Sequence, residues 1–200
     1  AYAAAYLAVF RKLKERLGFD RVRVAYSGAA PISPDVLKFF NAIGLPLIEG
    51  YGQTEGTGVT TVSRKGHLKI GRVGQPLPGV EVKIASDGEI LVKGPGIFKG
   101  YFKNPEATAE TLKEGWLHSG DLAQIDEKGY IRIVGRMKDV IMKDGETIVP
   151  IEIEEVLCTH PKVLDVQVIG VPDPQHGEEI AAWIRLRKGE RSTEEEMLNF

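Results

Sequence analysis

Two short strand-like segments, each followed by a glycine-bearing loop, constrain the fold more than any other feature of this sequence. Residues 22–26 alternate between apolar and other side chains and run into Ser27-Gly28-Ala29-Ala30-Pro31. Residues 45–48 are largely apolar and run into Glu49–Gly58, a stretch with four glycines. Both segments have the length and composition of strands in a sheet.

A helix is predicted between these strands. Ser33 is a good N-cap, Pro34 suits the first helical position, and Asp35 favours the positive end of the helix. The helix is expected to stop at Gly44. Strand, helix and strand in this order predict a parallel pair with a right-handed crossover, so both loops should leave the same edge of the sheet. Ligands of open α/β sheets bind beyond that edge.

The side chains of the second loop favour a phosphate-bearing ligand. Its glycines expose backbone N–H groups and allow close approach to the main chain. Its threonines, Thr54 among them, can bond phosphate oxygens, Glu55 can hold a hard cation, and Tyr51 can face a flat ring. We therefore predict a nucleotide-binding turn.

The two best-known glycine-rich nucleotide motifs do not occur. Residues 94–101 are rich in glycine but lack the Lys-Ser/Thr ending of the P-loop, and no G-x-G-x-x-G lies between a strand and a helix. Gly94 and Gly96 are expected to occupy turn and bulge positions. The predicted site therefore belongs to another class of nucleotide-binding site.

Hairpin patterns dominate the middle of the chain. Val80–Ile84 and Glu89–Val92 flank an Asp-Gly turn, and Leu122–Ile125 and Tyr130–Val134 flank a second turn. These patterns predict a small antiparallel β unit with the form of a distorted barrel.

The last third of the chain has mixed helix and strand patterns. A third hairpin is predicted around residues 143–146, and a helix should begin at Pro150. Residues 163–169 and 180–187 are predicted strands, and Ser192 or Thr193 should cap a last, short helix.

Composition narrows the classes of function. With 200 residues, the chain is one large domain or two small ones, and its formal net charge of −2 gives no electrostatic case for nucleic-acid binding. The single cysteine, Cys158, forms no disulfide within the chain, which favours a reducing, cytoplasmic location, and it is expected to be a buried thiol.

Membrane insertion is not expected. No run of about 18 apolar residues occurs, so no span is predicted, although peripheral contact with a membrane stays open. Ala1–Phe10 lacks the basic start of a signal peptide. Both ends of the sequence lie in helical patterns, which suggests a piece of a longer protein. The oligomeric state is left open.

Three further residues are candidates for function, two of them at a nucleotide site. Asp121 follows a glycine before a strand and could accept from both hydroxyls of a ribose, or it could bond its own turn. Arg136 could reach a ribose or phosphate with its planar fork. Lys138 lies where the composition changes and could be a pivot between domains. A surface ion pair is the alternative for Arg136 and Lys138, and His118 is expected to be structural.

Five motifs in order make the chain resemble the adenylate-forming superfamily, which contains acyl-CoA synthetases, firefly-type luciferases and peptide-synthetase adenylation domains. The motifs are Ser27–Pro31, Glu49–Glu55, Gly100-Tyr101 with Asn104–Thr108, Trp116–Asp121, and Gly135–Asp139 followed by Pro150–Glu154. The likeness covers nearly the whole chain. Leu45–Gly52 and Gly66–Gly71 make it most similar to a long-chain fatty acid CoA ligase.

The resemblance implies an α/β plus β plus α+β architecture in three parts. Residues 1–70 would be the C-terminal, parallel βαβ part of a large adenylate-binding domain. Residues 71–137 would be an antiparallel, β-barrel-like subdomain. Residues 138–200 would be the hinge and an incomplete C-terminal lid domain.

The resemblance also implies the reaction. In this family a carboxylate attacks the α-phosphate of ATP with Mg²⁺, which gives an acyl-adenylate and pyrophosphate. The thiol of coenzyme A then attacks the acyl carbon and releases AMP. The implied partners are therefore the small molecules fatty acid, ATP and coenzyme A. An acceptor carrier protein, or a nucleotide-binding module without catalysis, are the alternatives.

The family's roles can be carried over to individual residues. Tyr51 would stack on adenine, Thr54 would bond phosphate, Glu55 would bind magnesium, Asp121 would clamp the ribose, and Lys138 would be the catalytic hinge. The implied nucleotide-binding residues are Gly28, Ala29, Ala30, Glu49, Gly50, Tyr51, Gly52, Gln53, Thr54, Asp121 and Arg136.

Some parts of the family's machinery are expected outside this sequence. The triphosphate-binding loop would lie before Ala1 and the lysine that drives adenylation after Phe200. The chain also departs from the common motifs, with Ser119 in place of threonine, Gln53 in place of leucine or methionine, and 144–146 without a second glycine. The 200-residue piece is therefore expected to be inactive alone.

Overall fold

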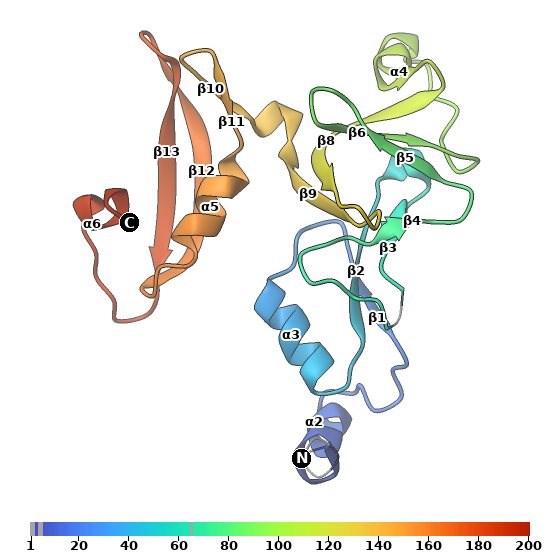
Figure 1. The fold of residues 1–200 in the computed structure, drawn as a ribbon, viewed down its shortest axis with the longest axis vertical. Coiled ribbons are helices and arrows are strands. Elements are labelled where there is room, and N and C mark those ends of the chain that lie inside the picture. The colour runs from blue at the N-terminus through green and yellow to red at the C-terminus, as the bar shows by residue number, and fades with distance from the viewer. Residues whose placement is uncertain (1–2, 4–5, 65) are drawn as a thin grey trace. The chain divides into compact units, whose positions relative to one another are not determined.

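A computed structural model describes residues 3, 6–64 and 66–200 (Figure 1). Contacts divide the chain into two units, residues 1–119 with 123–133, and residues 120–122 with 134–200. The three-part division at residues 70 and 137 stays a prediction. Tyr2, part of the predicted first helical pattern, lies outside the described residues.

The first unit begins with helical segments and a mixed sheet. Its helices here are η1 (Tyr6–Phe10), α2 (Arg11–Arg16), α3 (Pro34–Ala42) and η2 (Thr54–Gly56). The sheet has the order β1 (Ala25–Ser27), β2 (Leu47–Tyr51), β3 (Thr61–Val62), β4 (Gln75–Pro76). β1 and β2 are parallel, as predicted, whereas β2–β3 and β3–β4 are antiparallel.

Local sequence explains α3 and its neighbouring strands. The Ser33 side chain accepts a hydrogen bond from the backbone N–H of Asp35, with Pro34 in the first turn. Gly44, just beyond the helix, has φ of 80°, a conformation that glycine adopts without strain. Leu37 is fully buried on the inner face of the helix. β1 is shorter than predicted, because the alternation at 22–24 lies before the first residue paired with β2.

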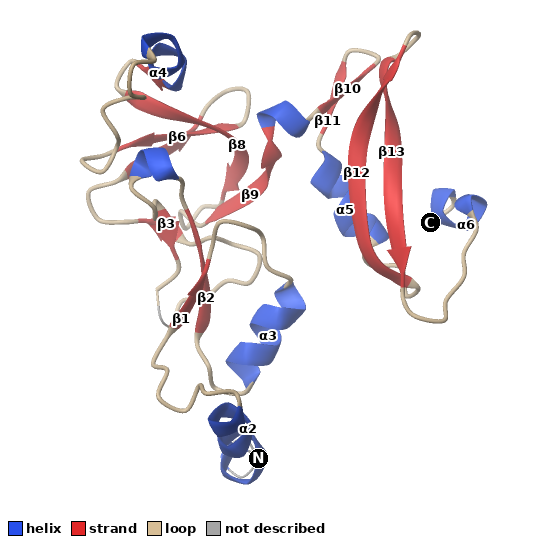
Figure 2. Ribbon diagram, turned by 180° about the vertical axis from the view of Figure 1, so that it is seen from behind, coloured by secondary structure: helices blue, strands red, loops and turns tan. Residues whose placement is uncertain are grey.

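A second, five-stranded sheet follows in the chain (Figure 2). Its strands are β5 (Glu81–Ile84), β6 (Glu89–Lys93), β7 (Leu112–Lys113), β8 (Trp116–Ile125) and β9 (Ile131–Arg136). The order is β5-β6-β8-β7, with β9 also paired to β8. The two predicted hairpins are present, and a short helix, α4 (Pro105–Thr111), precedes β7.

The barrel-like form predicted for residues 71–137 is wrong, since no sheet of the described residues closes. β4 pairs with β3 and so joins the first sheet, while β5–β9 form an open one. Thr61 Oγ1 donates to the Val73 carbonyl at 2.8 Å in the buried interior, and a Cβ at Gly74 would overlap the Val62 and Ser63 backbone. Alternating side chains predict strands but do not specify their neighbours.

The core of the first unit lies between its sheets and loops. The buried cluster consists of Val73, Ile90, Ala123 and Ile131, with Tyr51, Val82, Ile84 and Ile133 packed against it. The ring of Tyr51 therefore belongs partly to this core.

The second unit is a small α+β arrangement. η3 (Met137–Asp139) is followed by β10 (Ile141–Lys143), β11 (Glu146–Ile148), α5 (Pro150–Leu157), β12 (Val163–Asp173), β13 (Gly177–Leu186) and α6 (Glu194–Leu198). The antiparallel sheet has the order β11-β10-β13-β12. The predicted hairpin, the helix start at Pro150 and the cap at Thr193 are present.

Cys158 is exposed, which corrects the prediction of a buried thiol. It caps the C-terminal end of α5, where Leu157 is the buried residue. No helix of the described residues is both long and apolar enough to span a bilayer.

Candidate functional site

Two loops meet at one edge of the β1–β2 pair, as the sequence predicts. Ser27 lies opposite Glu49 in the parallel register, so the chain leaves both strands at the same level. A Cβ at Gly28 would lie 3.2 Å from the Gly50 carbonyl oxygen. Ala29 has φ of 67°, a left-handed conformation that is uncommon for a residue with a side chain. The two loops are thus in direct backbone proximity.

Glu49 contacts the end of the first loop through its side chain. Its side chain is buried, and its Oε1 accepts a hydrogen bond of 3.4 Å from the backbone N–H of Ile32. Burial raises the pKa of the Glu49 carboxyl, and the bond from Ile32 lowers it to a smaller extent. The structure therefore gives Glu49, a predicted nucleotide contact, a position that fixes the loop of residues 28–32.

The second loop is a tight turn with exposed polar side chains. The Gln53 carbonyl accepts from Gly56 N at 3.0 Å and from Gly58 N at 3.1 Å, which closes the 3₁₀ turn η2. A Cβ at Gly52 would overlap the Gly58 carbonyl, so this turn requires glycine there. Thr54 is exposed and Glu55 is half-buried.

The carboxylate of Glu55 contacts a residue to which the sequence assigns no role. The Tyr101 hydroxyl donates to Glu55 Oε1 at 2.7 Å. This hydrogen bond is the largest of the effects that raise the pKa of the Tyr101 hydroxyl; burial raises it further and a hydrogen bond with Thr111 lowers it. In the sequence, Tyr101 follows Gly100 and precedes the helix cap at Asn104. A residue so close to a helix start is held in place, which is the one sequence feature that points to Tyr101.

The residues around Glu55 fit a magnesium ion that arrives with a nucleotide. The described residues contain no group of three or more His, Cys, Asp or Glu side chains that could hold a metal. Magnesium in nucleotide sites is held by one or two protein groups and by phosphate oxygens. A half-buried carboxylate at Glu55, next in sequence to the exposed Thr54, is compatible with this mode.

Asp121 and Arg136 lie together in the second unit. Arg136 Nε donates to Asp121 Oδ1 at 2.8 Å, and the carboxylate is buried while the arginine side chain is 54% exposed. The sequence proposed these residues as neighbours at a ribose, and an ion pair as the alternative for Arg136. The ion pair is present and leaves the guanidinium accessible to solvent.

His118 has a carboxylate partner within the sheet. Its Nδ1 lies 2.6 Å from Oε2 of the buried Glu89, and Ser119 Oγ donates to the Ile90 carbonyl at 2.7 Å. Both contacts join β8 to β6. The structural role expected for His118 agrees with this pairing.

The predicted hinge residue and the predicted hairpin around residues 143–146 fall in the second unit. Lys138 is the central residue of η3, directly after Arg136 and Met137. At the tip of the β10–β11 hairpin, Asp144 Oδ1 lies 2.7 Å from His176 Nδ1. That hydrogen bond is the main reason that the pKa of His176 is raised. The tip is thereby held to the turn between β12 and β13.

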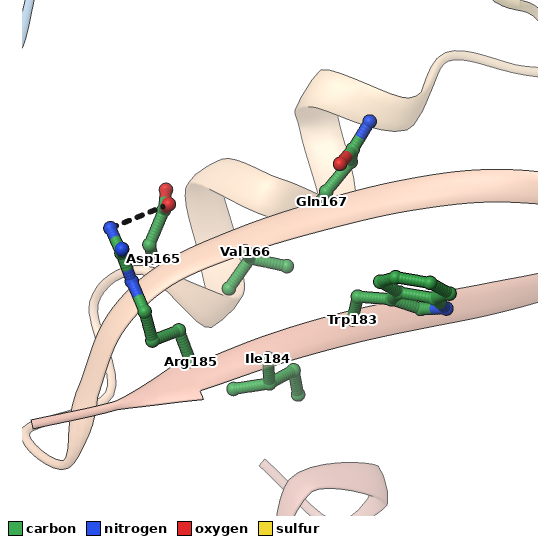
Figure 3. A pocket seen from close by; sticks show the side chains of 6 residues that line it. All are labelled: Asp165, Val166, Gln167, Trp183, Ile184 and Arg185. Carbon is green, nitrogen blue, oxygen red and sulfur yellow. Dashed lines mark hydrogen bonds and ion pairs between the residues drawn. The ribbon is translucent and has the colours of Figure 1, made fainter.

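A shallow cavity of about 290 Å³ lies on the β12–β13 ribbon (Figure 3). Its lining residues are Asp165, Val166, Gln167, Trp183, Ile184 and Arg185. Arg185 and Asp165 form an exposed cross-strand ion pair at 3.0 Å, and Trp183 is 73% exposed. None of the predicted site residues lines this cavity.

Two family profiles match the chain. Residues 3–102 match AMP-binding enzymes, and residues 152–200 match the C-terminal domain of AMP-binding enzymes. A curated relative, the long-chain-fatty-acid–CoA ligase FadD15 of Mycobacterium bovis, is 41% identical over 167 residues, which cover 83% of this chain and 28% of that protein.

Solved structures show the same fold. ATP-bound MatB from Rhodopseudomonas palustris is 34% identical with a TM-score of 0.85, over 99% of this chain and 41% of that one. The o-succinylbenzoate CoA synthetase MenE from Bacillus subtilis, in complex with its acyl-adenylate intermediate, is 33% identical with a TM-score of 0.74, over 84% of this chain and 37% of that one. The chain thus spans well under half of the length of these relatives.

Proposed function

Because the chain belongs to the AMP-binding enzyme family, we propose that it is part of an ATP-dependent acid–thiol ligase. The observation that carries the proposal is the meeting of two loops at the β1–β2 edge, where Gly28 lies close to the Gly50 carbonyl and the second loop carries Thr54 and Glu55. Backbone N–H groups, a hydroxyl and a carboxylate together suit a nucleotide with its cation.

Within this proposal, the first unit binds adenine and phosphate. The exposed part of the Tyr51 ring stacks on adenine, and its packing against the core holds the ring in place. The backbone of Gly28–Ala30 lines the adenine and acyl side. Gly50, Gly52 and Gln53 shape the turn, Thr54 bonds the phosphate, and Glu55 holds Mg²⁺. Developing charge on phosphorus is stabilised by such fixed donors.

The proposal assigns the ribose contact to Asp121 and the change between half-reactions to Lys138. Asp121 accepts from the ribose hydroxyls, and Arg136, which donates to Oδ1, orients that carboxylate. Lys138 is the pivot for movement of the C-terminal domain between adenylation and thiolysis. Coenzyme A is the proposed thiol acceptor.

Long-chain fatty acid is the proposed substrate class. Its support is the likeness to FadD15, whose name gives that activity, and the motifs at residues 45–52 and 66–71. MenE, which is 33% identical to this chain against 41% for FadD15, is named for o-succinylbenzoate, an aromatic acid. A panel of acids of graded length and aromatic content, with pyrophosphate release as the readout, selects between these classes.

The central test removes two carboxylates in the full-length protein. Glu55→Ala and Asp121→Ala are each expected to lower acid-dependent ATP–pyrophosphate exchange by a factor on the order of 100 or more, because each removes a contact to the reacting nucleotide. Glu15→Ala and Asp20→Ala, which alter exposed carboxylates, are the matched controls. Wild-type exchange in both site variants would refute the assigned roles.

Two alternatives have their own readouts. An enzyme that loads a carrier protein would show pyrophosphate exchange but no acyl transfer to free coenzyme A. A non-catalytic binding module would bind ATP without any acid-dependent exchange. The isolated 200-residue chain is expected to form no acyl-CoA, since the proposed triphosphate loop and catalytic lysine lie outside it.

A further inference from the structure

A second segment of the first unit holds the turn that carries Glu55. The backbone N–H of Phe98 donates to the Glu55 carbonyl at 2.8 Å, and Thr57 Oγ1 donates to the Gly96 carbonyl. The Tyr101 hydroxyl adds the contact to Glu55 Oε1 at 2.7 Å. Main chain and side chain of the turn are therefore both engaged by residues 96–101.

Tyr101 is itself fixed from the opposite side. Its backbone N–H donates to Thr108 Oγ1 at 2.9 Å, and the same hydroxyl donates to the Asn104 carbonyl at 2.7 Å. The ring packs edge-to-face on Phe98, with centroids 4.8 Å apart. A Cβ at Gly100 would lie 2.6 Å from Thr108 Cγ2, so glycine allows this close approach. The start of α4 thus anchors the tyrosine.

We propose that Tyr101 is a positioning residue for Glu55. Its hydroxyl occupies Oε1, fixes the rotation of the carboxylate, and leaves Oε2 to face the cation that accompanies the nucleotide. A neutral hydrogen-bond donor suits this task because it orients the carboxylate and leaves its negative charge available to the cation. A lysine in the same place would neutralise that charge. Partners behind a metal ligand commonly set its orientation and the affinity for the metal. The inference rests on the proposed function.

A purely structural role for Tyr101 predicts a different result. If the hydroxyl only held residues 96–101 in place, its loss would lower stability and leave the cation affinity of a folded protein unchanged. Tyr130 provides a matched comparison in the same unit, because its hydroxyl donates to the His67 carbonyl at 3.1 Å. Tyr130→Phe removes one tyrosine hydrogen bond without touching Glu55.

The test measures Mn²⁺ binding to the full-length protein. Mn²⁺ is titrated in the presence of a non-hydrolysable ATP analogue and followed by electron paramagnetic resonance, so that no turnover is needed. Tyr101→Phe is expected to weaken Mn²⁺ binding about tenfold. Its midpoint of thermal unfolding and its metal-free nucleotide affinity should shift no more than those of Tyr130→Phe.

Glu55→Gln makes the outcomes separable. If Glu55→Gln weakens Mn²⁺ binding and Tyr101→Phe does not, the positioning role is overturned and the proposed function stands. If Tyr101→Phe and Tyr130→Phe weaken Mn²⁺ binding equally, the positioning role is also overturned. Mn²⁺ binding that depends on Tyr101, in a protein that shows no pyrophosphate exchange with any acid, supports the positioning role and refutes the ligase reaction.

Discussion

Gly52 shows how one missing side chain allows the candidate site to form. The turn after β2 brings the backbone of residues 58–60 back over Gly52, and an added Cβ would lie 2.7 Å from the Gly58 carbonyl carbon and 2.8 Å from Thr60 N. Such distances do not occur between real Cβ atoms and their neighbours. The turn that carries Thr54 and Glu55 depends on this close return of the chain.

Gly52→Ala is therefore expected to destabilise the protein. Backbone atoms must shift to admit the methyl group, which costs about 1–3 kcal/mol in the free energy of unfolding. Urea unfolding followed by circular dichroism measures this loss. Gly96→Ala is the control, because its Cβ would meet its nearest neighbours at an ordinary 3.5 Å. Equal losses in the two variants would contradict the steric explanation.

The residues of the candidate site differ in how far the sequence specifies them. The meeting of the 28–30 and 50–55 loops follows from parallel strands, and the backbone proximity of Gly28 and Gly50 confirms it. The Tyr101 contact joins positions 46 residues apart and depends on how the 94–104 loop folds. The residue pattern within residues 50–55 or within residues 94–104 does not indicate that Tyr101 and Glu55 are in contact.

The turn between β8 and β9 is the element with the clearest electrostatic stabilisation. Asp126 Oδ1 accepts from the backbone of Lys128 and of Tyr130, each at 3.0 Å, and Oδ2 lies 2.8 Å from Lys69 Nζ. The hydrogen bond from Lys69 is the largest of the effects that lower the pKa of Asp126 to about 2. The ordinary value is 3.8.

This shift predicts how stability changes in acid. Because the folded-state pKa is lowered, the contribution of Asp126 is complete above pH 3.8 and is lost as the pH falls through about 2. Asp126→Asn should therefore be less stable than wild type at pH 7, and the difference should shrink between about pH 4 and pH 2. Thermal unfolding at a series of pH values measures this difference.

A second variant checks the assigned partner in that turn. Lys69→Met keeps most of the side-chain length and removes the charge next to Asp126. The difference in stability between Lys69→Met and wild type should also become smaller as the pH falls from about 4 to about 2. Parallel acid curves for wild type and both variants would show that the carboxylate and the ammonium do not interact.

Most elements with a strong local sequence signal were predicted correctly, whereas the limits and neighbours of strands that depend on distant partners were not. The cap at Ser33, the two-loop strand pair and the hairpins follow from neighbouring residues. β8 extends back to Trp116, beyond the predicted start at Leu122, because Trp116 and Leu117 pair with β7. α4 also escaped prediction, although Asn104 accepts from Ala107 N and Pro105 begins the helix.

At the scale of the whole molecule, the chain passes between the two units more than once. Residues 120–122 belong with 134–200, while 123–133 belong with the first 119 residues. The last boundary between the units falls between residues 133 and 134, and Lys138, the proposed pivot, lies beyond it in η3, within the second unit.

Lys138→Pro tests the pivot in the full-length protein. Proline fixes φ near −65°, so rotation about this residue is blocked while the nucleotide contacts stay in place. Acyl-CoA formation is expected to fall more than pyrophosphate release, because only the second half-reaction follows the proposed domain movement. Lys138→Ala keeps the backbone free and is the control. An equal loss of both rates in Lys138→Pro would contradict a hinge role.

The ion pair between Asp121 and Arg136 has a consequence for recombination between homologous genes. A crossover after residue 133 would inherit the buried carboxylate from one parent and the arginine from the other. A viable hybrid should then receive an arginine with compatible reach, since its loss would remove a hydrogen-bond donor from the buried Asp121 carboxylate. Residues 120–122 belong to the second unit but are encoded upstream of such a crossover. They would not be transferred with the C-terminal part, which limits its exchange as a module.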